Sequence, residues 1–66
     1  MKKNKQLELE LQAAKLLLAR KSPFEVSEQL SLTLGTVARV LTWIAYPQMA
    51  TPNFAKGLLE QMLRQA

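Results

Sequence analysis

With 66 residues, 48% of them hydrophobic, the chain is long enough for one small domain and lies near the lower size limit for folding without covalent or metal cross-links. It has no cysteine and no histidine, and its five acidic residues are all glutamates, so we expect neither an enzyme nor a bound metal or cofactor. The net charge of +4 favours a polyanionic partner.

The N-terminal segment, residues 1–5, is polar and basic, and we expect a flexible basic arm followed by a single domain over residues 6–66. Glu8 and Glu10 interrupt any apolar core of a signal peptide. No stretch approaches the roughly 20 apolar residues that a membrane-spanning helix needs. We therefore expect a soluble, cytoplasmic protein that does not enter a membrane.

Residues 6–20 contain strong helix formers and no Gly, Pro or β-branched residue, which predicts a helix. This helix has two apolar stripes on roughly opposite sides. One stripe consists of Leu7, Leu11, Ala14 and Leu18, with Leu17 at its edge, and the other consists of Leu9, Ala13 and Leu16. Because a domain this small is expected to cover only one of these faces, the second face predicts contact with another subunit.

The next two helices are marked by capping signals. Ser22 and Glu25 have the spacing of a capping box, and Pro23 suits the first turn of a helix over residues 23–30. A break at residues 31–32 precedes Thr33, a good N-cap for a third helix over residues 34–45. In the third helix the predicted core stripe is Val37, Val40, Leu41 and Ile44, and the predicted outward residues are Gly35, Ala38, Arg39 and Thr42.

The last helix is predicted from Thr51-Pro52, which repeats the cap-and-proline signal, to about residue 65. Its apolar residues are Phe54, Leu58, Leu59, Met62 and Leu63. Gly57 weakens this helix by about 1 kcal/mol relative to alanine. No strand signal is present, so the predicted fold is all-α, a small four-helix domain with a central helix-turn-helix.

The segment from Val26 to Leu41 resembles the helix-turn-helix of bacterial and phage repressors. The pair Val26-Ser27 matches the β-branched and small residues of that motif, residues 30–33 match its turn, and residues 36–41, TVARVL, are similar to a run in lactose-repressor-type headpieces. The match covers about a quarter of the chain. It departs from the pattern at Ser31, where glycine is usual and a positive φ is unfavourable for serine.

A second resemblance covers more of the chain. The order of a leucine-rich helix, a helix-turn-helix, a proline-bearing connector and a closing helix is similar to the tryptophan repressor family, which implies a dimer. The basic residues that clamp the corepressor in that family have no counterpart on the first helix here, so control by a small molecule is not carried over.

The helix-turn-helix resemblance implies that residues 34–45 are a recognition helix. Arg39 is the first candidate for a base contact, because arginine paired with guanine is the commonest specific contact in the major groove; its alternative is a solvated surface side chain. The predicted DNA-binding residues are Arg20, Lys21, Ser22, Thr33, Leu34, Gly35, Thr36, Ala38, Arg39 and Thr42.

These observations predict a sequence-specific regulator that binds double-stranded DNA, most simply a small bacterial, phage or plasmid repressor that acts as a homodimer. The residues predicted for the dimer interface are Leu9, Ala13, Leu16, Trp43, Phe54, Leu58 and Met62. The alternative is a protein-interaction module, an inhibitor or adaptor that uses the small-residue face of Gly35, Ala38 and Thr42 to bind a protein.

Overall fold

Four α-helices and one short 3₁₀ helix form the part of the chain that the computed structural model describes, residues 5–65, and no strand occurs there. The α-helices are α1 (Lys5–Leu18), α2 (Pro23–Leu30), α3 (Leu34–Ala45) and α4 (Pro52–Gln65); the 3₁₀ helix η1 (Pro47–Met49) joins α3 to α4. The predicted all-α class with four helices is confirmed. Within residues 5–65, no helix combines the length and the apolar composition that a bilayer span requires.

The predicted basic arm, residues 1–5, lies almost entirely outside the described residues. Lys5 is the exception, because it is the first residue of α1 and is exposed there. The helix therefore begins one residue earlier than predicted.

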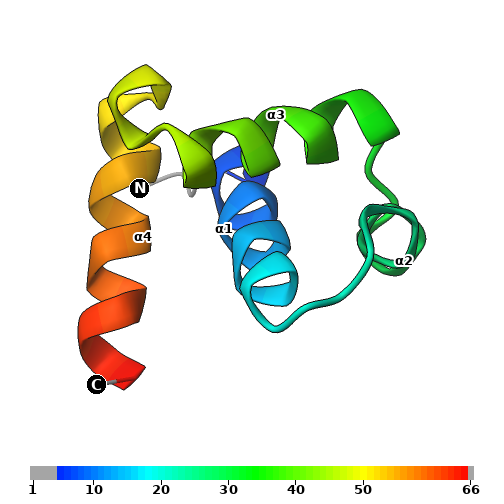
Figure 1. Ribbon diagram of the computed structural model, residues 1–66, viewed down its shortest axis with the longest axis horizontal. Coiled ribbons are helices and arrows are strands. Elements are labelled where there is room, and N and C mark those ends of the chain that lie inside the picture. The colour runs from blue at the N-terminus through cyan, green and yellow to red at the C-terminus, as the bar shows by residue number, and fades with distance from the viewer. Residues whose placement is uncertain (1–4, 66) are drawn as a thin grey trace.

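Helix α1 occupies the centre of the molecule, with α3 running across it and α2 and α4 on either side (Figure 1). Both of its predicted apolar stripes find partners inside the chain: Ala13 and Ala14 are fully buried, and further leucines of α1 pack against the core, namely Leu7, Leu11, Leu16 and Leu17. Leu9 is half-buried and Leu18 is 50% exposed, so part of each stripe is left at the surface, and contact with a second subunit stays a prediction.

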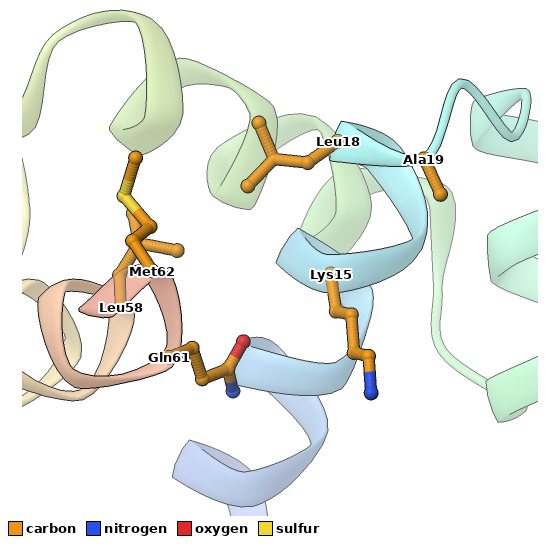
Figure 2. A pocket seen from close by; sticks show the side chains of 6 residues that line it. All are labelled: Lys15, Leu18, Ala19, Leu58, Gln61 and Met62. Carbon is orange, nitrogen blue, oxygen red and sulfur yellow. The ribbon is translucent and has the colours of Figure 1, made fainter. Parts of the chain in front are cut away.

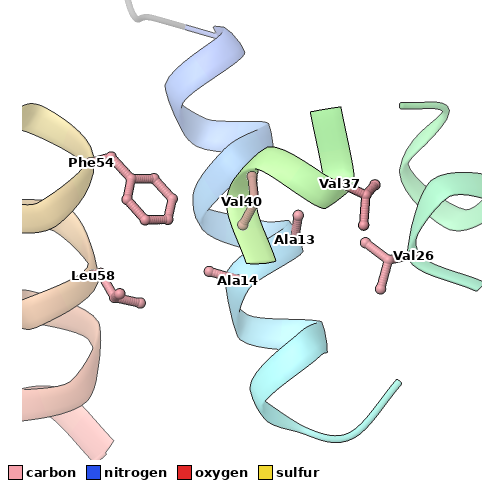
Figure 3. Close-up of a cluster of buried hydrophobic side chains, with 7 residues drawn as sticks. All are labelled: Ala13, Ala14, Val26, Val37, Val40, Phe54 and Leu58. Atoms are coloured by element: carbon pink, nitrogen blue, oxygen red, sulfur yellow. The ribbon is translucent and has the colours of Figure 1, made fainter. Parts of the chain in front are cut away.

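The core is built from small side chains where α1 meets α3 (Figure 3). Ala13 and Ala14 belong to the same buried cluster as Val37 and Val40, and side chains this small allow helices to approach closely. Val26 brings α2 into the same cluster, and Phe54 and Leu58 bring in α4. The Trp43 ring packs against the Phe54 ring with 5.0 Å between their centroids, at 57° to it.

Hydroxyl caps mark the starts of the last three α-helices. The Ser22 hydroxyl oxygen accepts a hydrogen bond from the Glu25 N–H at 3.2 Å, and Thr33 accepts one from the Thr36 N–H at the same distance. Thr51 accepts one from the Phe54 N–H at 3.4 Å. Each bond satisfies a backbone donor that the first turn leaves free, which is why the predicted starts of these helices are confirmed.

The end of α1 lies two residues before the predicted end at Arg20. Arg20 adopts the left-handed region, with φ at 71°, and the Lys21 N–H donates to the Leu16 carbonyl at 3.0 Å. This hydrogen bond closes the helix and turns the chain toward α2. No glycine signals the stop, which explains why the sequence pattern runs past it.

Candidate nucleic-acid interface

The connection between α2 and α3 is a tight turn closed by several hydrogen bonds. Ser31 lies in the left-handed region, with φ at 55° and ψ at 41°, and the Leu32 N–H donates to the Ser27 carbonyl at 3.0 Å. The Ser27 hydroxyl in turn donates to the Leu32 carbonyl. Ser27 thus stabilises the turn through hydrogen bonds, in addition to being small enough for the turn to fit. Sequence reasoning did not assign the hydrogen-bonding role.

Helix α3 presents a face to solvent that carries most of the predicted DNA-binding residues. Leu34, Gly35, Ala38 and Thr42 are exposed, and Thr36 is half-buried beside them. Val37 and Val40 lie on the opposite side, in the core. We call the exposed side, consisting of Leu34, Gly35, Ala38, Leu41, Thr42 and Ala45, the outer face of α3.

The hydroxyl groups of α3 are engaged by the helix itself. The Thr42 hydroxyl donates to the Ala38 carbonyl at 3.0 Å, and the Thr33 and Thr36 hydroxyl oxygens lie 3.0 Å apart in a hydrogen bond. The outer face therefore offers methyl groups and close backbone approach more than free donors. Leu41, predicted to lie in the core, is 45% exposed and belongs to this face.

Arg39 lies at the edge of the outer face and is held by α1. Its Nη2 donates to Glu10 Oε2 at 3.1 Å, and its guanidinium carbon lies 5.3 Å from the centre of the Trp43 ring. The Arg39 side chain is nevertheless 51% exposed, whereas that of Glu10 is 8% exposed. Gln6 donates a second hydrogen bond to Glu10 Oε2 at 3.4 Å. Arg39 was predicted to point outward for a DNA contact, with a solvated surface side chain as the alternative; it is anchored to Glu10 and keeps about half of its surface toward solvent.

Glu10 is a residue of this site that sequence reasoning missed. It was read only as an interruption of an apolar run, yet it lies three residues before Ala13 and four before Ala14, on the buried side of α1. That position was the available signal, because a buried carboxylate requires a partner. Arg39, the basic residue of α3, supplies it.

The predicted residues before α2 lie apart from the outer face of α3. The connection between α1 and α2, which carries Arg20, Lys21 and Ser22, lies beyond the C-terminal end of α1, well away from α3 (Figure 1). Arg20 and Lys21 are exposed there, and Ser22 caps α2. The structure thus brings Thr33, Leu34, Gly35, Thr36, Ala38, Arg39 and Thr42 together and leaves these three elsewhere.

Three residues predicted for a dimer interface are corrected by their burial. Ala13 and Phe54 are fully buried inside the chain and Leu58 is nearly so, hence they have no surface left for a partner. Leu9, Leu16 and Trp43 are half-buried. Met62 remains exposed, on the side of α4 that the core does not use.

Comparisons of the chain with protein-family models, with curated proteins and with solved structures found no match. A helix held by a closed turn, with an uncharged outer face and one anchored cation at its edge, is suited to lie against a surface.

Proposed function

We propose that α2, the turn at residues 31–33 and α3 form a helix-turn-helix that places the outer face of α3 in the major groove of duplex DNA, and that the chain is a small transcription regulator. The observation that carries this proposal is the turn itself. Ser31 in the left-handed region and the paired bonds between Ser27 and Leu32 fix α3 relative to α2 while its outer face stays exposed.

Electrostatics supports the same surface. No acidic residue occurs between Glu28 and Glu60, so α3 carries none, and Glu10, which reaches α3 from α1, is buried and paired with Arg39. With a net charge of +4 on the chain, the outer face meets a phosphate backbone without a like charge of its own.

Arg39 is suited to contact a phosphate at the edge of the groove. Glu10 holds its guanidinium beside α1, to one side of Gly35, Ala38 and Thr42, and the guanidinium has further N–H groups in its planar fork. Because anchoring by Glu10 orients the side chain before binding, less rotamer entropy is lost on contact. Sequence is then read by the small residues, through close approach and methyl contacts with thymine.

Selection of duplex DNA from a random library with the purified chain tests the proposal directly. We expect enrichment of a defined half-site and an affinity that falls by orders of magnitude over a few-fold rise in salt concentration. Failure to enrich any duplex, even at low salt, would overturn it.

A matched pair of charge variants tests which surface binds. Ala38→Glu adds a carboxylate to the outer face of α3, whereas Gln12→Glu adds the same charge on α1, where Gln12 lines hollows with residues of α2 and α4. Because like charges across an interface weaken it strongly, we expect Ala38→Glu to lower DNA affinity by about tenfold or more and Gln12→Glu to have a much smaller effect. Equal losses would mean that α3 is not the reading surface.

One observation favours a second function, in which the outer face binds a protein helix. Leu34, Ala38, Leu41 and Ala45 follow the i, i+4, i+7, i+11 spacing of an apolar stripe, and Leu34 and Leu41 are both exposed. Such a contact would persist at about 0.5 M salt, where binding led by phosphates is largely lost. The salt titration therefore separates the two functions.

A further inference from the structure

Helix α4 has a second apolar face that the core does not cover. Phe54 and Leu58 point into the core, but Leu59, Met62 and Leu63 are 58%, 53% and 67% exposed. At 100° per residue these three side chains and Ala55 fall on one side of the helix, adjacent to the buried side. Side chains of this size on one strip mark a contact surface rather than ordinary scattered exposure.

The same face borders two apolar hollows. One, with a volume of about 280 Å³, lies between α4 and the end of α3, where Trp43 and Pro47 face Ala55, Leu59 and Met62. The other, of about 180 Å³, lies between α4 and the end of α1, and Leu18 points across it toward α4 (Figure 2). Met62 lines both hollows, so they adjoin along α4, and the second is bordered on its outer side by Lys15 and Gln61.

Charged residues of both signs flank this face on one side. Lys56, Glu60 and Arg64 each follow one residue after Ala55, Leu59 and Leu63, so they form a row along one edge of the face, with the acid between the two bases. An anionic membrane or DNA would favour a row of bases alone. A row of alternating sign instead complements a copy of itself that runs in the opposite direction.

We propose that this face of α4 binds the same face of a second copy of the chain, with the two α4 helices antiparallel and the two-fold axis near Leu59. In that register Leu59 meets its own counterpart. Ala55 lies opposite Leu63 of the second copy, so a small residue faces a large one on both sides of the axis. The two-fold axis brings the two charged edges together, and Glu60 then lies within about two residues, roughly 3 Å along the axis, of Lys56 of the second copy.

This pairing does not depend on DNA binding, because no residue of the face belongs to the outer face of α3. The two proposals can therefore fail separately. A dimer that binds no DNA would leave this inference intact, and a monomer that binds DNA would overturn it.

Sedimentation equilibrium of the chain at micromolar concentration provides the first test. We expect a dimer, and we expect Leu59→Lys to weaken its dissociation constant by more than about tenfold, because it places two like charges at the centre of the contact. Phe24→Lys is the matched control, since Phe24 is as exposed as Leu63 but lies on α2. Circular dichroism of each variant confirms that the helices remain folded. A folded wild-type chain at the mass of one copy would overturn the proposal, as would equal weakening by both variants.

Cross-linking tests the antiparallel register. The chain has no cysteine, so Ala55→Cys and Leu63→Cys each introduce a single thiol. Residues 55 and 63 lie about 12 Å apart along a helix, and a thiol at either position therefore meets its own counterpart poorly. With a short bismaleimide, we expect a mixture of the two variants to give a cross-linked dimer in much higher yield than either alone. Efficient cross-linking of each variant with itself would indicate parallel helices and contradict the proposed register.

Discussion

Ser31 holds a backbone conformation that glycine adopts more readily. Its φ of 55° lies in the left-handed region, where a β-carbon is disfavoured, and the residue is exposed. We expect Ser31→Gly to raise the free energy of unfolding by about 1 kcal/mol, and hence to raise Tm by about 4–8 °C in a thermal melt followed by circular dichroism.

The same substitution at Ser22 is the control for this prediction. Ser22 has φ at −72° and its hydroxyl caps α2, so Ser22→Gly should lower stability by a few tenths of a kcal/mol rather than raise it. A lower Tm for Ser31→Gly would mean that the serine side chain contributes more to the turn than its backbone strain removes.

Individual side chains show where sequence reasoning stops. The capping roles of Ser22 and Thr33 were predictable because a cap depends on residues three positions apart in the chain. The pairing of Arg39 with Glu10 was not, because it joins residues 29 positions apart and depends on how α1 crosses α3. The candidate site was thus predicted in its local parts, and its long-range contact was found only in the folded chain.

At the scale of the helices, sequence periodicity predicted the number and starts of the elements well. Every predicted start lies within one residue of the observed one, and hydroxyl or proline signals mark the starts of α2, α3 and α4 locally. The end of α1 was missed because a left-handed arginine, rather than a glycine, stops it. Leu41 was misassigned because it lies at the edge of the α3 core stripe, where spacing alone does not decide which side is covered.

The contact between α4 and α1 depends on Gly57. A β-carbon placed on Gly57 would lie 2.7 Å from Leu11 Cδ1 and 3.1 Å from Leu11 Cδ2, so both methyl groups of Leu11 would have to move. Alanine gains about 1 kcal/mol over glycine in a helix interior, while overpacking loses about 1–3 kcal/mol. We therefore expect Gly57→Ala to lower the stability of the wild-type chain, or at best to leave it unchanged.

The sign should reverse when Leu11 is shortened. In a Leu11→Ala background the crowding methyl groups are absent, so Gly57→Ala should stabilise the chain by about 1 kcal/mol. Chemical unfolding of the four members of this double-mutant cycle measures the reversal. Equal effects of Gly57→Ala in both backgrounds would show that α4 does not pack closely on α1 at this position.

For the molecule as a whole, the large share of apolar residues predicted apolar surface beyond what one small core covers, on the first helix or on the last. Two stripes on the first helix suggested that it faces a partner, and three helices of the same chain pack against it. The apolar residues that remain exposed lie on α4, which forms one side of the molecule with α2 on the other (Figure 1). The spacing of apolar residues predicts how many apolar faces a helix has. The packing of the other helices decides which of those faces the chain itself covers.

A dimer joined through α4 and reading DNA through α3 should couple the two proposals in one measurement. Pairing along one side of the molecule leaves both copies of α3 uncovered, so two half-sites about 34–36 Å apart would be bound together.

Once one subunit of the dimer has bound its half-site, the second subunit binds the other half-site intramolecularly, which raises the overall affinity. We therefore expect Leu59→Lys, which separates the subunits, to lower the affinity for a duplex with two half-sites by about a hundredfold or more. Affinity for a duplex with one half-site should stay the same, since Leu59 lies outside the outer face of α3. Phe24→Lys, which adds the same charge away from the α4 face, should change the affinity for the two duplexes by the same factor. Equal losses on the two duplexes would show that α4 itself touches DNA, and no loss on either would show that each copy reads DNA alone.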